Sequence, residues 1–97
     1  MQENERKIGG LRLVQTCSSH PEQYDVYAGR KLVGYLRLRG GVFRCDYPTH
    51  YADGGRTIYE ACPRGDGEFY DDERLFYLRA AVKAIKENMP HERKSKR

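Results

Sequence analysis

The sequence lacks the features that mark several classes of protein. No apolar run in its 97 residues approaches the roughly 18 residues that a membrane-spanning helix needs. Residues Met1 to Lys7 lack the apolar segment of a secretory signal peptide. The glycine pairs are not followed by the Gly-Lys-Ser/Thr of a phosphate-binding loop, and no serine stands in a nucleophile elbow. We therefore expect a cytoplasmic protein that is not an enzyme and has no membrane partner.

Cysteine is scarce, and its spacing argues against a disulfide framework. The three residues Cys17, Cys45 and Cys62 are an odd number without a Cys-x-x-Cys pair, so we expect reduced thiols. One interpretation assembles a zinc site from Cys17 with His20 and Cys45 with His50, with Cys62 as a spare ligand. The other places Cys45 in an apolar core as a small hydrophobic residue. We favour the second, because structural zinc sites usually show tighter paired spacing, and we expect no cofactor.

A glycine pair in the middle of the chain predicts a β-hairpin. Gly40-Gly41 separates two alternating runs, and a two-residue hairpin loop needs positive φ at both central positions. Counting back from the turn pairs Arg39 with Val42, Leu38 with Phe43, Arg37 with Arg44, Leu36 with Cys45 and Tyr35 with Asp46. One face of the hairpin is therefore apolar, and the other carries arginine and tyrosine. Arg37 and Arg44 stand about 5 Å apart, an unfavourable pairing of like charges unless an anion or an acidic partner relieves it.

Further strands are expected on both sides of this hairpin. Alternation predicts strands over 11–15, 24–27 and 57–62. A turn at Gly29-Arg30 would pair Tyr27 with Leu32 on the apolar face and Tyr24 with Tyr35 on the other. We expect residues 1–10 to be a flexible N-terminus, 11–90 to be a single domain, and 91–97 to be a basic disordered tail.

A helix follows the last strand. Asp71 is the expected N-cap, Tyr70 and Leu75 have the spacing of a hydrophobic staple, and Pro90 marks the end. An apolar stripe is expected to pack on the sheet, formed by Leu75, Leu78, Val82, Ile85 and Met89. A basic stripe, Arg79, Lys83 and Lys86, lies at its boundary. The predicted class is α+β, an antiparallel meander of four to five strands with one C-terminal helix on one face.

Charge is distributed unevenly along the chain. Lys and Arg outnumber Asp and Glu by eight to four over residues 1–45 and by seven to two over 76–97, whereas residues 46–75 have three basic and eight acidic side chains. The acidic run from Asp66 to Glu73 does not have the spacing of a calcium-binding loop. Capping of the helix accounts for its last three acids and leaves Asp66 and Glu68 as an acidic edge that could face a basic partner.

Several segments together resemble small proteins carried by phages and mobile elements of Gram-positive bacteria. The resemblance covers residues 24–88 and rests on Tyr24-Asp-Val-Tyr27, the run Val33–Arg39, the run Phe43–Pro48, Ile58-Tyr-Glu-Ala61, and Gly65-Asp-Gly67 with the following Asp-Glu-Arg helix. Among such proteins are anti-CRISPR inhibitors of Cas9, to which this chain is similar in size, mixed charge and lack of catalytic motifs. Those inhibitors share no common motif, so no functional residue is carried over by position.

Two hypotheses for the function follow. The first is an inhibitory binding protein, anti-CRISPR-like, that blocks a Cas9-type nuclease of a bacterial host or its guide-RNA assembly. The second is a regulatory nucleic-acid-binding module, in which arginines meet phosphates and tyrosines stack on unpaired bases. Only the first uses acidic residues at the interface. Candidate binding residues are Tyr35, Arg37, Arg39, Arg44, Asp66, Glu68, Arg79, Lys83 and Lys86.

Overall fold

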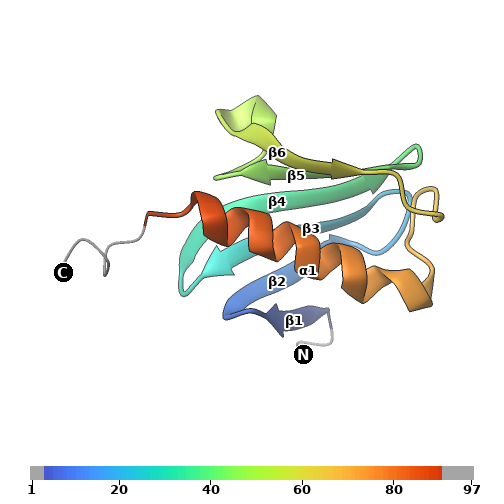
Figure 1. Cartoon of the computed structure of the whole chain (residues 1–97), viewed down its shortest axis with the longest axis horizontal. Helices are drawn as coiled ribbons and strands as arrows, with labels where there is room; N and C mark the ends of the chain where they lie inside the picture. The colour runs from blue at the N-terminus through green and yellow to red at the C-terminus, as the bar shows by residue number, and fades with distance from the viewer. Residues whose placement is uncertain (1–3, 91–97) are drawn as a thin grey trace.

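The computed structural model describes residues 4–90 in two layers, a sheet and a helix (Figure 1). Six strands form one antiparallel sheet in chain order: β1 (Glu5–Ile8), β2 (Leu11–Cys17), β3 (Glu22–Ala28), β4 (Lys31–Arg39), β5 (Val42–Tyr47) and β6 (Arg56–Ala61). A short 3₁₀ turn, η1 (Tyr51–Asp53), lies between β5 and β6, and α1 (Asp71–Asn88) crosses one face of the sheet. The α+β prediction is confirmed, with one strand more than expected.

The additional strand lies near the start of the chain. β1 falls within residues 1–10, where the sequence predicts a flexible terminus, and its Ile8 pairs with Leu11 of β2. The tail predicted over residues 91–97 lies outside the described residues. No helix in the described part of the chain is long and apolar enough to cross a membrane.

The hairpin around Gly40-Gly41 has the predicted register. All five pairs between β4 and β5 are confirmed, including Arg37 opposite Arg44. The turn forms because both glycines adopt positive φ, 61° and 79°, which residues with a Cβ rarely do. The apolar side of the hairpin is fully buried beneath α1, so its arginine side faces away from the helix.

The register between β3 and β4 differs from the prediction. Tyr27 pairs with Leu32, but Val26 pairs with Gly34, so Val33 is an extra residue in a β-bulge. The bulge shifts the following pairs by one residue, and Tyr24 stands opposite Leu36 rather than Tyr35. Tyr24 is therefore a core residue, 1% exposed. The predicted face of Tyr27 is also wrong. Tyr27 pairs with Arg12, which alternates with buried leucines on β2 and therefore lies on the face away from the core. The guanidinium carbon of Arg12 lies 4.8 Å from the centre of the Tyr27 ring.

The helix packs on the sheet through most of the predicted stripe. Leu78, Val82 and Ile85 are buried, and Met89 is packed against the core, whereas Leu75 is 42% exposed. The close approach of helix and sheet depends on Gly34, because a Cβ there would lie 2.5 Å from Cδ1 of Ile85.

The helix start is built differently from the prediction. Its N-cap is Tyr70, not Asp71, and the backbone N–H of Tyr70 donates to the carboxylate of Glu73 at 3.1 Å. The predicted staple is wrong, because both Tyr70 and Leu75 are exposed. The first turn of the helix is therefore held by the carboxylate of Glu73 and not by an apolar contact.

The three cysteines are expected to differ in reactivity. Cys45 is buried, and desolvation raises the pKa of its thiol to about 12, whereas Cys62 is exposed. Because the thiolate is the reactive form, we expect Cys62 to be alkylated at pH 8 in the native protein and Cys45 to react only after unfolding. Mass spectrometry after brief treatment with iodoacetamide, with and without urea, measures this difference. Equal labelling of both residues under native conditions would contradict the fold.

Candidate binding surfaces

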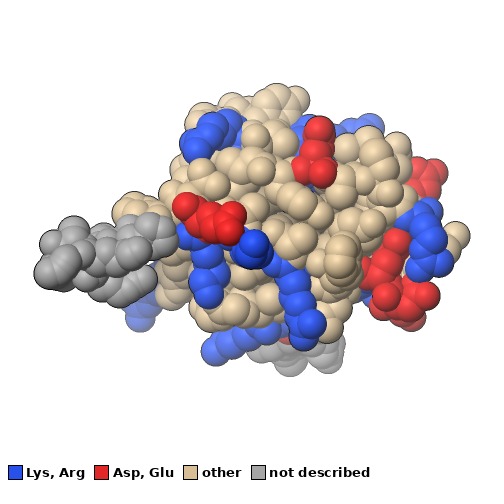
Figure 2. Space-filling model, in the orientation of Figure 1, with Lys and Arg blue, Asp and Glu red and all other residues tan. Residues whose placement is uncertain are grey.

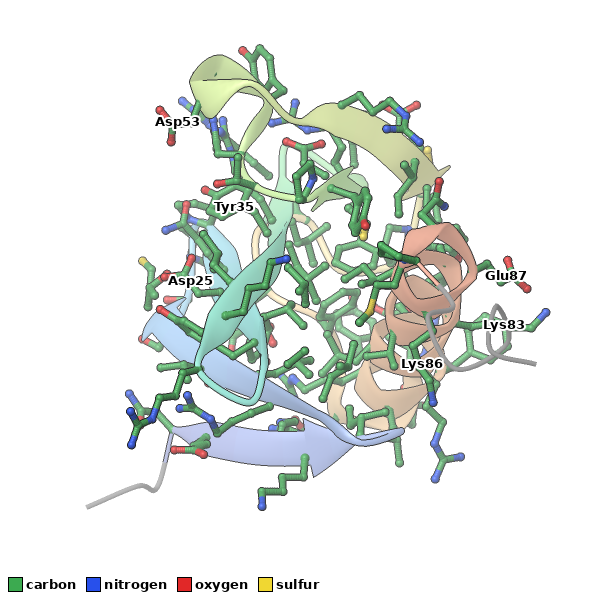
Figure 3. The ribbon with its side chains drawn as sticks, turned by 90° about the vertical axis from the view of Figure 1, so that its left-hand side faces the viewer. Asp25, Tyr35, Asp53, Lys83, Lys86 and Glu87 are labelled. Carbon is green, nitrogen blue, oxygen red and sulfur yellow. The ribbon has the colours of Figure 1, made fainter. Side chains whose placement is uncertain are left out.

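The sheet face that points away from α1 carries three arginines at one end of β4 and β5. Arg37, Arg39 and Arg44, hereafter the arginine cluster, alternate along their strands with buried apolar residues. Together with Val42 they line a small concavity of about 100 Å³. Viewed along the sheet edge, the face that bears Asp25 and Tyr35 lies on the side opposite α1 (Figure 3). The alternation of two paired strands therefore gathers three cations on one face, where Arg39 is exposed and Arg37 and Arg44 are half-buried.

Arg44 is held in place from two sides. Its Nε lies 3.2 Å from Oδ1 of Asp46, and its guanidinium carbon lies 4.6 Å from the centre of the Tyr51 ring. Asp46 is fully buried and also accepts hydrogen bonds from the Tyr51 backbone N–H at 3.0 Å and from Thr57 Oγ1 at 2.8 Å. The same carboxylate thus orders the loop between β5 and β6 and positions Arg44.

Within residues 4–90, no carboxylate pairs with Arg37 or Arg39 as Asp46 does with Arg44. The register places Glu60 of β6 beside Arg44, on the side away from Arg37, and this exposed glutamate also forms no ion pair within the described range. The pairing of like charges at Arg37 and Arg44 that the hairpin register predicts is therefore present, and within residues 4–90 only Asp46 forms an ion pair with the cluster.

Aromatic rings adjoin the arginine cluster. Tyr35 is half-buried, and its hydroxyl donates to Gln23 Oε1 at 2.8 Å. The His50 ring meets Tyr35 edge-on at 4.5 Å and stacks on Tyr51 at 4.9 Å between ring centres. Burial raises the pKa values of both Tyr35 and its neighbour Asp25. Sequence reasoning missed His50 and Tyr51, because they come from a loop whose path depends on the buried Asp46.

The predicted acidic edge lies against the turn of the arginine hairpin. The backbone N–H of Gly41 donates to the carbonyl of Asp66 at 2.9 Å. Asp66 and Glu68 are exposed, whereas Gly65, Gly67 and Phe69, which alternate with them, are buried. The structure therefore brings Asp66 to the end of the sheet from which Arg39 projects, so that opposite charges adjoin on the surface.

Two buried carboxylates, Glu73 and Glu22, shape this acidic loop. The sequence assigned Glu73 to the start of the helix but did not indicate Glu22. Glu73 accepts hydrogen bonds from the backbone N–H groups of Arg64 at 2.9 Å and Gly65 at 2.8 Å. These bonds lower the pKa of Glu73 despite the opposing effect of desolvation, which is the largest single influence. Glu22 accepts from the backbone N–H of Phe69 at 2.9 Å. The loop is therefore fastened at both ends to groups inside the protein.

Glu22 is the centre of a buried polar network. It is 1% exposed and lies 2.8 Å from Nε of Arg74 and 2.5 Å from the Tyr24 hydroxyl, which donates to it. Burial, followed by this hydrogen bond, raises the pKa of Tyr24. The network joins β3 to the start of α1. No local sequence pattern indicates it, because Glu22 and Arg74 are 52 residues apart in the chain.

No protein-family model, curated protein or solved structure matches this chain. Within residues 4–90, no group of three or more His, Cys, Asp or Glu side chains is arranged to hold a metal ion.

The predicted basic stripe of α1 forms a separate surface. Arg79, Lys83 and Lys86 line a groove of about 550 Å³ between the helix and the β1–β2 turn. Lys83 Nζ lies 3.4 Å from Oε2 of Glu87, and Lys86 Nζ donates to the carbonyl of Gly9 at 2.7 Å. Figure 2 shows this helix side, with acidic side chains gathered at the end where α1 begins. Lys83 and Lys86 lie on the side of the sheet opposite Tyr35, so the nine predicted residues do not form one surface (Figure 3).

Proposed function

We propose that this chain is a small non-enzymatic binding protein that acts as an anti-CRISPR-like inhibitor. Its partner is a Cas9-type nuclease of a bacterial host, or the protein–RNA complex that this nuclease forms with its guide. The observation that carries the proposal is the arginine cluster, in which Arg37 and Arg39 face solvent without an ion pair in the described structure. Uncompensated arginines on a rigid sheet favour an anionic partner, because docking relieves their mutual repulsion.

A surface with both signs of charge favours a protein–RNA complex over bare nucleic acid. Asp66 lies at the turn of the arginine hairpin, and Glu68 is exposed two residues later. Cas9-type nucleases hold nucleic acid in positively charged channels, so an acidic edge fits the channel wall while the arginines meet RNA or an acidic lobe. Acidic residues so close to the cluster would weaken contact with a long duplex.

One observation favours the alternative, a regulatory nucleic-acid-binding module. His50 and Tyr51 stack beside Arg44, and Tyr51 is 54% exposed. Arginines beside exposed aromatic rings are a common arrangement in proteins that bind single strands. This alternative requires salt-dependent affinity for RNA or DNA without any nuclease present.

A cleavage assay tests the proposal. A panel of purified Cas9-type nucleases cuts labelled target DNA, with the protein added either before or after guide RNA. We expect at least one nuclease to be inhibited, and stronger inhibition upon early addition would indicate a block of guide assembly. Failure to inhibit any member of the panel, together with tight salt-dependent binding to bare RNA, would support the alternative and overturn the proposed function.

A further inference from the structure

We propose that the arginine cluster is a binding site for a single phosphate group. The site is the surface that carries the proposed function, on which this inference rests, and the inference names the chemistry of the partner there. The phosphate can come from an RNA backbone or from a free anion, and the two sources share the same tetrahedral group of oxygen acceptors.

The size of the site favours a small anion. Arg37, Arg39, Val42 and Arg44 line a concavity of about 100 Å³, well below the roughly 300–1,000 Å³ of typical ligand pockets. A folded peptide segment or an apolar ligand needs far more room than this. A phosphate fits this scale, and its oxygens can accept hydrogen bonds from several guanidinium groups at once.

The arrangement of charge favours an anion with several acceptor oxygens over a single carboxylate. Arg37 and Arg44 are directly paired across the two strands, and Arg39 follows Arg37 on the same face. Asp46 already forms an ion pair with Arg44 from inside the protein. A ligand that supplied one carboxylate to each arginine would therefore not match this arrangement. Arg37 and Arg39, which have no ion pair within the described residues, both come from β4, and a dianion could bridge them to Arg44 on β5.

The site is preorganised. Asp46 and the Tyr51 ring fix Arg44 before any ligand binds, and the strand pairing between β4 and β5 fixes the backbone positions of the other two side chains. A fixed guanidinium loses less conformational entropy upon binding than a free one. Glu60 is an exposed acidic residue that stands beside Arg44 in the register, and its removal should strengthen binding.

Titration by NMR tests the site. The ¹⁵N-labelled protein is titrated with sodium phosphate, and separately with an oligouridine RNA, each at constant ionic strength balanced by sodium chloride. We expect the Nε–Hε signals of Arg37, Arg39 and Arg44 to shift. Arg37→Gln and Arg39→Gln should each weaken phosphate binding about tenfold, and Glu60→Gln should strengthen it about twofold.

Arg30 provides the matched control. It is an exposed arginine in the turn between β3 and β4, at the far end of β4 from the cluster. Arg30→Gln removes the same charge and should leave phosphate affinity unchanged. An equal loss in this variant, or phosphate binding that Arg37→Gln does not alter, would overturn the inference. Shifts with RNA that exceed those with phosphate would identify the backbone as the natural source.

The two proposals fail in different ways. If Arg37→Gln and Arg39→Gln abolish nuclease inhibition but phosphate does not bind, the arginines contact carboxylates of a protein and the phosphate site is wrong. If phosphate binds at the cluster but no nuclease is inhibited, the site stands and the proposed function is wrong.

Discussion

Replacing Glu22 with alanine is expected to lower the free energy of unfolding by about 3–5 kcal/mol. The side chain of Glu22 is fully buried, and that of its partner Arg74 is only 17% exposed. The truncation removes the buried partner of the Arg74 guanidinium, which keeps only the exposed carboxylate of Asp71 at 2.7 Å as an ion-pair partner within residues 4–90, and it also removes the acceptors of the Tyr24 hydroxyl and the Phe69 backbone N–H. A broken buried ion pair and two unpaired donors in the interior account for the size of the loss.

Urea denaturation followed by circular dichroism measures this loss. Because small domains are stable by only about 5–15 kcal/mol, Glu22→Ala can fail to fold, and Glu22→Gln provides the quantitative variant. The amide keeps one oxygen, which can still accept from the Phe69 N–H, but it loses the second oxygen and the charge that pairs with Arg74, so we expect a smaller decrease than with alanine. Glu68→Gln, an exposed change in the loop that Glu22 fastens, is the control. A change below about 0.5 kcal/mol in both Glu22 variants would contradict the role of the network.

Reversing two charges of the arginine cluster is expected to abolish inhibition. The variant Arg37→Glu with Arg39→Glu replaces the two arginines that have no ion pair within residues 4–90, so the fold should be retained. We expect the concentration needed for half-inhibition to rise by about 100-fold or more, because each lost charged contact contributes about 1.5–3 kcal/mol. Arg44 is left intact, since a glutamate there would face the buried Asp46.

The basic stripe of α1 provides the matched control for this prediction. Arg79→Glu with Lys83→Glu makes the same change of charge on exposed positions of the helix, on the other side of the sheet. We expect inhibition to change by less than about threefold, an effect of net charge alone. Loss of inhibition in the helix variant with retention in the sheet variant would assign the function to the groove beside β1 instead.

The sequence predicted correctly the strand pairs whose register is set by a tight turn. Gly40-Gly41 requires a two-residue turn, and a turn of known length fixes the register, so every pair between β4 and β5 followed from the sequence. The same reasoning failed at Gly29-Arg30, because the β-bulge at Val33 inserts one residue that no turn signal reveals. The error moved Tyr24 from the buried face to the open one.

Long-range contacts account for what the sequence did not indicate about the surfaces. From its local sequence Glu22 would be expected to face solvent. It is buried because its carboxylate pairs with Arg74 and accepts the backbone N–H of Phe69. The predicted register gives Asp46 only as the partner of Tyr35, whereas its side chain pairs with Arg44 and orders the loop that carries His50 and Tyr51. Alternation alone placed Arg37 and Arg44 together correctly, because the face of a strand residue depends on register and not on distant partners.

Photo-crosslinking tests most directly whether the arginine face is the docking surface. A benzoylphenylalanine residue is introduced in place of Val42, which is 39% exposed within the arginine cluster, or in place of Phe76, which is 67% exposed on α1. Each protein is irradiated with an inhibited nuclease and its guide RNA. We expect a crosslink to the nuclease or the RNA from position 42 and none from position 76. A crosslink from position 76 alone would contradict the account.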